Sequence, residues 1–282
     1  MKKTFFITGS SKGIGLQLSR SLLLQNHYVF GFSRANTLDH ENFTFTNIDL
    51  SDLNKVKTVI FPEVKTNQVV LINNAASIGE IKPLAKKNPE DIVNELSLNL
   101  IAPTLFCRNF IKTYADKEKL ILNISSGAAT KPIGSWNTYC ASKSALDMLT
   151  NVLCEEKYKD LRAISVYPGI VDTDMQTKIR NTSTKDFPLQ NKFNEYYINN
   201  ELIDPSHVAQ KIIYLVNNHQ DFLKNIVSVE ILIFNVNLVI IFICFLYNCL
   251  SFRRIDRDVI LNNFLFKNYV KKQKKHRKKT PN

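Results

Sequence analysis

The chain has 282 residues and an apolar fraction of 44%, which is ordinary for a folded protein with one large core or two small ones. Of the net charge of +12, residues 251–282 carry +9 (eleven Lys or Arg against two Asp), which leaves +3 for the first 250 residues. The five cysteines form no Cys-x-x-Cys pair and the five histidines are dispersed, so we predict no disulfide framework, no metal site and a reducing, cytoplasmic environment.

The N-terminal region has the order strand, glycine-rich loop, helix. Thr4–Thr8 is rich in β-forming residues, and the apolar spacing of residues 16–26 predicts an amphipathic helix. In this context glycines let the turn close and let the backbone approach a pyrophosphate, while the helix N-terminus offers free N–H groups. The predicted dinucleotide contacts in this loop are Gly9, Ser11, Lys12, Gly13, Ile14 and Gly15.

A second strand is predicted at residues 28–32 and ends at Ser33 and Arg34. Sites that prefer NAD place Asp or Glu near this point to bind the ribose 2′-hydroxyl, but no acidic residue precedes Asp39 here. The Arg34 guanidinium suits the 2′-phosphate of NADP, and Lys12 can assist it. We therefore predict NADP(H) as the cofactor. The alternative is that Arg34 is a solvated loop residue.

Strands and helices alternate along the rest of the body. Further strands are predicted at 43–48, 69–72, 120–125, 163–167 and 226–231. Helices are predicted at 51–61 with Ser51 or Asp52 as cap, at 89–114 with a disturbance at Pro103, at 139–158, and at 205–217 with Asp204 as cap. This alternation predicts a doubly wound α/β fold, a Rossmann-type parallel sheet of about seven strands in a single domain over residues 1–231.

The segment 174–200 interrupts this alternation. It is polar and irregular, with four aromatic residues spread through it. A long segment of this kind beside a proposed active site is usually a lid or a loop that selects the substrate. We therefore predict that it is the substrate loop.

A hydroxyl, a phenol and an ammonium stand at informative spacings in the middle of the chain. Tyr139 opens a predicted helix and Lys143 follows it by four residues, so the two side chains lie on one face. A nearby cation lowers the pKa of a phenol from about 10 toward neutral pH. Ser126, at the end of a predicted strand, can donate a hydrogen bond to a carbonyl oxygen that gains charge. Together the three side chains can move a proton to or from an oxygen that is bonded to carbon. The alternative is that Tyr139 and Lys143 are a surface pair without function.

Asn99 lies inside the helix predicted at 89–114, close to Pro103. Two interpretations are open for its side chain. It either satisfies backbone groups that the proline frees, or binds a water that links Lys143 to solvent and so passes protons.

These motifs together resemble the short-chain dehydrogenase/reductase family. Residues 8–15 match its T-G-x-x-x-G-x-G loop, residues 73–76 its N-N-A-G segment with Ala76 in place of Gly, and residues 168–173 its P-G-x-x-x-T segment. The family's catalytic tetrad falls on Asn99, Ser126, Tyr139 and Lys143. The resemblance covers about residues 1–231, and the remaining predicted cofactor contacts are Asp49, Leu50, Asn74, Ala75, Tyr139, Lys143, Pro168, Gly169, Val171 and Thr173.

Within the family, the runs NISSGA, W-x-x-Y-C and PGIVDTDMQ look most like the sepiapterin reductase and benzil reductase branch. The resemblance implies hydride transfer from NADPH to a ketone, diketone or aldehyde, with Tyr139 as the proton donor. Lys143 would lower the pKa of Tyr139 and hold the nicotinamide ribose, Ser126 would polarise the carbonyl, and Asn99 would support a water relay. Family members commonly form homodimers or homotetramers, and nothing predicts a specific nucleic-acid partner. The rival hypothesis is a non-catalytic dinucleotide-sensing protein of the same fold, although a sensor has no need of Ser126, Tyr139 and Lys143 together.

The chain departs from the family pattern after residue 231. Residues 232–252 contain no charge over 21 positions, long enough to span a bilayer, and the basic tail 253–282 would keep that end cytoplasmic. Three asparagines in the apolar segment are costly in hydrocarbon. Two alternatives are open: a membrane anchor, which would make the protein a membrane-attached reductase of lipid ketones, or an extraneous extension. The tail itself is predicted to be disordered.

Overall fold

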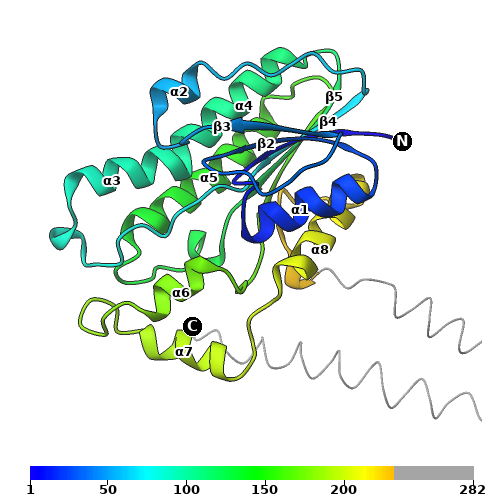
Figure 1. Cartoon of the computed structure of the whole chain (residues 1–282). Helices are drawn as coiled ribbons and strands as arrows, with labels where there is room; N and C mark the ends of the chain where they lie inside the picture. The colour runs from blue at the N-terminus through cyan, green and yellow to red at the C-terminus, as the bar shows by residue number, and fades with distance from the viewer. Residues whose placement is uncertain (232–282) are drawn as a thin grey trace, which may run out of the picture. The chain divides into compact units, whose positions relative to one another are not determined.

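Residues 1–231, the part of the chain that the computed structural model describes, contain a seven-stranded parallel sheet with helices on both faces (Figure 1). The strands are β1 (Thr4–Thr8), β2 (Tyr28–Ser33), β3 (Phe43–Asn47), β4 (Gln68–Asn73), β5 (Glu118–Ile124), β6 (Leu161–Tyr167) and β7 (Ile226–Ser228). The helices are α1 (Gly13–Leu24), α2 (Leu53–Lys57), α3 (Pro89–Leu96), α4 (Ala102–Thr113), α5 (Asn137–Glu155), α6 (Asp174–Arg180), α7 (Gln190–Ile198) and α8 (Pro205–Asn217). The doubly wound α/β prediction is confirmed.

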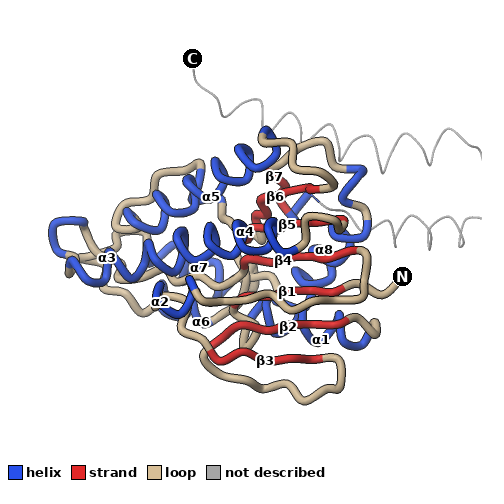
Figure 2. The backbone as a smooth tube through the Cα atoms, turned by 90° about the horizontal axis from the view of Figure 1, so that it is seen from above, coloured by secondary structure: helices blue, strands red, loops and turns tan. Residues whose placement is uncertain are grey.

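The strand order is β3-β2-β1-β4-β5-β6-β7, which Figure 2 shows from above. The chain starts in the middle of the sheet, builds outward to β3, and then returns past β1 to form β4. The direction of winding therefore reverses between β1 and β4. In open parallel sheets, ligands bind outside the carboxyl ends of the strands at such a reversal.

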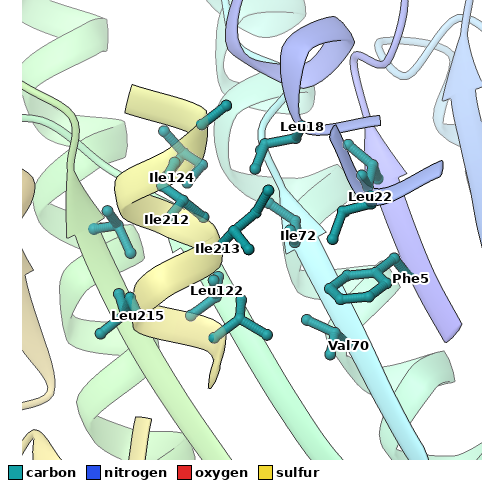
Figure 3. Close-up of a cluster of buried hydrophobic side chains, with 14 of the residues drawn as sticks. Phe5, Leu18, Leu22, Val70, Ile72, Leu122, Ile124, Ile212, Ile213 and Leu215 are labelled. Carbon is teal, nitrogen blue, oxygen red and sulfur yellow. The ribbon is translucent and has the colours of Figure 1, made fainter. Parts of the chain in front are cut away.

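Each strand of the sheet interior is apolar on both sides because helices cover both faces. On one face Phe5 and Ile7 of β1 pack with α1 and α8, through residues such as Leu18 and Ile212 (Figure 3). On the other face Phe6, the residue between them, packs with α2 and α4. The alternation within β1 thus feeds two separate cores.

The second core is rich in aromatic rings. Phe6 lies with its ring centroid 5.0 Å from that of Phe61, edge to face, and 5.9 Å from that of Phe110 on α4. Edge-to-face pairs of this kind contribute about 0.5–1.5 kcal/mol each beyond the area they bury. They hold α4 against β1, beside the winding reversal.

Two predicted elements are shorter in the structure. The helix predicted at 51–61 ends at Lys57, because the β-branched residues 58–60 and the following Phe-Pro step favour extended backbone. Its cap is Asp52, whose carboxylate accepts from the N–H groups of Asn54 and Lys55. The strand predicted at 226–231 ends at Ser228 and continues as a 3₁₀ turn.

The helix predicted at 89–114 is disturbed next to Pro103, as expected. Pro103 has no N–H to donate to the carbonyl of Asn99 four residues earlier, so an α-helical bond is missing there. Between α3 and α4 the structure has a π-helical turn, Ser97–Ile101. Turns of this type are rare and often occur at functional sites.

The irregular structure predicted for residues 174–200 is wrong. The segment contains α6 and α7, and both helices bury apolar side chains: Ile179 on α6 and Phe193 on α7. Tertiary packing against Trp136 stabilises these short helices where local propensity does not.

The apolar segment 232–252 and the basic tail 253–282 lie outside the described residues. Within residues 1–231, no helix has the length and apolar character that crossing a bilayer requires. Neither the anchor nor the extraneous extension is tested, and both stay predictions.

Candidate active site

The glycine loop between β1 and α1 has the backbone geometry that a phosphate cradle needs. Gly9 and Gly13 have φ angles of +69° and +53°, a region that side chains disfavour. A Cβ on Gly15 would lie 2.2 Å from the carbonyl oxygen of Gly9, so only glycine fits there. Lys12, at the N-cap of α1, makes no side-chain cap bond, which leaves the first N–H groups of the helix for a ligand. The loop therefore fits a pyrophosphate.

Asn74, directly after β4, fastens this loop to the neighbouring strand. Its amide nitrogen Nδ2 donates to the carbonyl oxygens of Thr8 at 3.0 Å and Gly9 at 3.2 Å. In return, the Thr8 hydroxyl oxygen accepts from the backbone N–H groups of Asn74 and Ala75. The two predicted cofactor segments thus meet at the winding reversal. Asn74 acts here as a support for the loop.

The residues predicted to bind the adenosine half follow β2 and β3. Arg34 is exposed after β2, and its charge acts on Asp49 after β3. Hydrogen bonds from Ser51 are the main cause of the lowered pKa of Asp49, and Arg34 adds to it. Leu50 is buried in the second core. Lys12, predicted to assist Arg34, forms an exposed ion pair with Asp174 of α6, with Nζ 2.7 Å from Oδ2, and its part in cofactor binding stays a prediction.

Beyond β6, residues 168–173 lead from the sheet to the glycine loop, which they reach at Thr173. Gly169 has a φ of +82°, and Val171 forms a parallel bridge with Ile203. A Cβ on Gly13 would lie 3.2 Å from the methyl carbon of Thr173, so Thr173 lies against the glycine loop. The remaining predicted contacts in this region are Ser11, Ile14 and Pro168. Ser11 and Pro168 are half-buried, and Ile14 packs on the first core.

Tyr139 has Lys143 as a neighbour on its own helix and Ser126 as a neighbour from the end of β5. Ser126 follows β5, whereas Tyr139 and Lys143 lie on successive turns of α5, both buried. The Lys143 Nζ donates to the carbonyl oxygen of Ile124 at 2.7 Å and lies 5.7 Å from the centroid of the Tyr139 ring. The three side chains predicted to carry the chemistry are therefore brought together.

The predicted lowering of the Tyr139 pKa is wrong in this structure. Burial raises the pKa of Tyr139 to about 12, and a hydrogen bond with the Ser126 hydroxyl opposes that shift without overcoming it. Burial also lowers the pKa of Lys143 to about 8. Desolvation is the largest cause of both shifts. At neutral pH the phenol therefore keeps its proton, which is the form that a proton donor needs.

Asn99 is buried in the π-helical turn, and both polar atoms of its side chain are hydrogen-bonded. Its Oδ1 accepts from the backbone N–H of Ser77 at 2.9 Å, and its Nδ2 donates to the carbonyl oxygen of Ser77 at 2.8 Å. As one of the two interpretations predicted, the side chain satisfies backbone groups. These groups belong to Ser77, in the loop after β4, and not to the helix next to Pro103. Its part in a water relay stays a prediction.

Three buried ionisable residues in or next to α5 were missed in the sequence. Lys87 and Glu95 form an ion pair with Nζ 2.6 Å from Oε2, and the Lys87 Nζ also donates to the Thr138 hydroxyl at 2.7 Å. No local pattern marks this pair. Asp147 is also buried and lies one turn beyond Lys143 on α5. Its spacing of four residues from Lys143 could have identified it in the sequence as a neighbour on the same helix face.

An aromatic cluster covers Tyr139 from the side of α6 and α7. The Trp136 ring is edge to face with that of Tyr139, at 5.7 Å between centroids, and stacked on that of Phe187 at 5.6 Å. Phe193 of α7 completes the group. The segment 174–200 therefore contributes a hydrophobic wall next to the phenol, while its action as a lid stays a prediction.

Comparisons with known proteins agree with this geometry. The family model described as "short chain dehydrogenase" matches residues 3–184. The chain is 32% identical to a benzil reductase ((S)-benzoin forming) of Bacillus subtilis over 224 residues, covering 75% of this chain and 92% of that protein. It is 29% identical to a sepiapterin reductase of Xenopus laevis over 248 residues, covering 77% and 94%. A crystal structure of a short-chain dehydrogenase/reductase from Saccharomyces cerevisiae has the same fold, with a TM-score of 0.71, 22% identity, and coverage of 80% and 96%.

Proposed function

Because the chain belongs to the short-chain dehydrogenase family, we propose that it is an NADPH-dependent reductase of ketones, diketones or aldehydes. The family consists of oxidoreductases that use a nicotinamide dinucleotide and act on carbonyl or alcohol groups. The observation that carries the proposal is the meeting of Ser126, Tyr139 and Lys143 beside a glycine loop shaped for a pyrophosphate.

The roles of the residues follow from their surroundings. When bound, the dinucleotide supplies a hydride to the carbonyl carbon. Tyr139, protonated at neutral pH, gives its proton to the carbonyl oxygen, and Ser126 donates a hydrogen bond to the same oxygen. Lys143 stabilises the phenolate that remains. The carbonyl gains one hydride and one proton and becomes an alcohol.

The aromatic wall favours a substrate with a flat apolar group next to the carbonyl. Trp136 and Phe187 border the phenol, and aromatic groups pack well against aromatic side chains. Two of the similar proteins are named benzil reductase and sepiapterin reductase. A spectrophotometric screen of NADPH oxidation over aromatic diketones, quinones, aldehydes and pterins tests the proposal. Failure to oxidise NADPH with any of these classes would favour the sensor hypothesis.

For the cofactor, replacing Arg34 by Ala is expected to weaken NADPH binding by about 10-fold or more and to leave NADH nearly unaffected. The physical reason is the loss of a charged hydrogen-bond donor, worth about 1.5–3 kcal/mol, from the 2′-phosphate. Dissociation constants from nucleotide fluorescence provide the measurement. Arg20→Ala, an exposed arginine on α1, is the matched control. Equal weakening of both nucleotides by Arg34→Ala would remove the basis for choosing NADP.

We further propose that the protein self-associates as a homodimer or homotetramer. Met148 and Val152, four residues apart on α5, are 62% and 43% exposed and form an apolar strip on its outer face. Light scattering should give a mass of two or four chains for the wild type. Replacing both residues by Lys should shift that mass toward one chain, and an unchanged assembly would exclude this face.

A further inference from the structure

Helix α5 carries a third ionisable residue in line with Tyr139 and Lys143. Asp147 follows Lys143 by four residues, so the three side chains stand on successive turns of one face, and all are at least 94% buried. Two hydroxyls of β6 hold its carboxylate: Ser165 donates to Oδ1 and Tyr167 donates to Oδ2. An ionised carboxylate only accepts hydrogen bonds, so two donating hydroxyls match it.

The surroundings of Lys143 give this carboxylate its importance. The Lys143 Nζ donates a hydrogen bond to the carbonyl oxygen of Ile124, a neutral partner, and the lysine is buried. Burial lowers the pKa of Lys143 to about 8, and the charge of Asp147 acts in the opposite direction. The charged form of Lys143 at neutral pH therefore depends on a balance between desolvation and Asp147.

Other titratable groups lie near the same part of α5. Tyr139 is on the helix itself, and Tyr167 on β6 stays protonated because burial raises its pKa. Lys87 and Glu95 reach α5 at Thr138 as a mutually neutralised pair. The π-helical turn 97–101 and the turn 127–129 that pack on α5 contain no titratable residue, and the acidic and basic residues of β5 are at its opposite end. Asp147 is thus the charged group whose field acts on Lys143.

We propose that Asp147 is a positioning residue for the reduction: its carboxylate, fixed by Ser165 and Tyr167, keeps Lys143 in the charged form beside Tyr139. The inference rests on the proposed function, because the charge on Lys143 matters when Tyr139 gives up its proton. A purely structural Asp147 would only tie α5 to β6. The two roles differ in their effect on the pH dependence of turnover.

The test compares Asp147→Asn with Tyr167→Phe in the full-length protein. Raising the pH through the pKa of Lys143 removes its charge and lowers kcat. Asp147→Asn keeps the shape but removes the carboxylate charge, so the fall should begin at lower pH, by about one unit. At pH 8 the variant should then be about 5-fold slower than wild type, and near pH 6 the two should converge. Tyr167→Phe removes one hydroxyl but keeps the charge, and its alkaline limb should stay in place.

Three outcomes contradict the proposal. An alkaline limb that does not move in Asp147→Asn, a uniform loss at all pH values, or an equal movement in Tyr167→Phe would each assign Asp147 a structural role. Nucleotide binding and circular dichroism check that each variant folds. Asp147→Ser serves as the second neutral variant where the asparagine protein is unstable.

A measurement without turnover separates this inference from the proposed function. Lysines labelled with ¹³C at Cε can be followed by NMR, and the Lys143 signal is identified by its absence in Lys143→Met. Wild-type Lys143 should titrate near pH 8 and Asp147→Asn at lower pH. An unchanged titration overturns the role of Asp147 even where carbonyl reduction is demonstrated. A lowered one supports it even where every tested carbonyl fails.

Discussion

Replacing Tyr139 by Phe is expected to lower kcat for carbonyl reduction by about 10²–10⁴-fold, the range typical of a lost general acid. The ring is buried against Trp136, and Phe preserves that packing while it removes the proton. Dinucleotide binding should stay within a few-fold of wild type, because the glycine loop and Arg34 are untouched. Initial rates at saturating NADPH and a dissociation constant from fluorescence measure the two quantities separately.

Tyr158→Phe provides the matched control for this experiment. Tyr158 lies just beyond the far end of α5 and is exposed, so the same chemical change there should leave kcat unaltered. Turnover that survived in Tyr139→Phe would show that another group supplies the proton. It would also remove the need for the Ser126, Tyr139 and Lys143 arrangement.

The second large effect concerns stability. Replacing Lys87 by Met is expected to lower the free energy of unfolding by about 3–5 kcal/mol, because it leaves the Glu95 carboxylate buried without its cation. The side chains of Lys87 and Glu95 are 0% and 6% exposed, and Glu95 also accepts from the backbone N–H of Glu80. Chemical denaturation followed by circular dichroism gives the measurement.

The neighbouring residue supplies the control for Lys87. Lys86 forms an ion pair with Asp186 at 3.3 Å, but its side chain is 61% exposed, so Lys86→Met should cost at most about 1 kcal/mol. Adding Glu95→Gln to Lys87→Met removes the unpaired charge and should restore part of the lost stability. If Lys86→Met and Lys87→Met lowered the free energy of unfolding by similar amounts, burial of the Lys87–Glu95 pair would not be the cause of a large effect.

The positions of the site residues could be predicted because the fold repeats one arrangement. Motif residues follow β1, β2, β4, β5 and β6 directly, and all strands are parallel, so their carboxyl ends meet at one edge of the sheet. The spacing of Tyr139 and Lys143 likewise determined that they share one face of α5. These are local patterns, and local patterns can be recognised along a single chain.

The energetics of the site could not be predicted in the same way. The raised pKa of Tyr139 depends on burial by Trp136 and by residues more than forty positions away, such as Phe187 and Phe193. The Lys87–Glu95–Thr138 contacts join three separate elements, and nothing in the spacing of these residues indicates their pairing. The ion pair between Lys12 and Asp174 likewise depends on the packing of α6 beside the glycine loop.

The helices of segment 174–200 had a signal that was weak but present. Met175 and Ile179 are four residues apart, and Phe193 and Tyr196 are three apart, spacings that match one face of a helix. Both helices are shorter than ten residues and are surrounded by polar residues, so the apolar period covers too few positions to stand out.

The π-helical turn Ser97–Ile101 restricts how the length of this region can vary. A π-helical turn already holds one residue more than an α-helical turn, so a further residue inserted there would rotate every later side chain of α4 by about 100°. Phe106 and Phe110, which now pack on the sheet, would then point along it or toward solvent. Single-residue insertions should therefore be rejected between Leu96 and Pro103. They should be tolerated at residues 35–37, in the exposed turn beyond Arg34, where no helix transmits the shift.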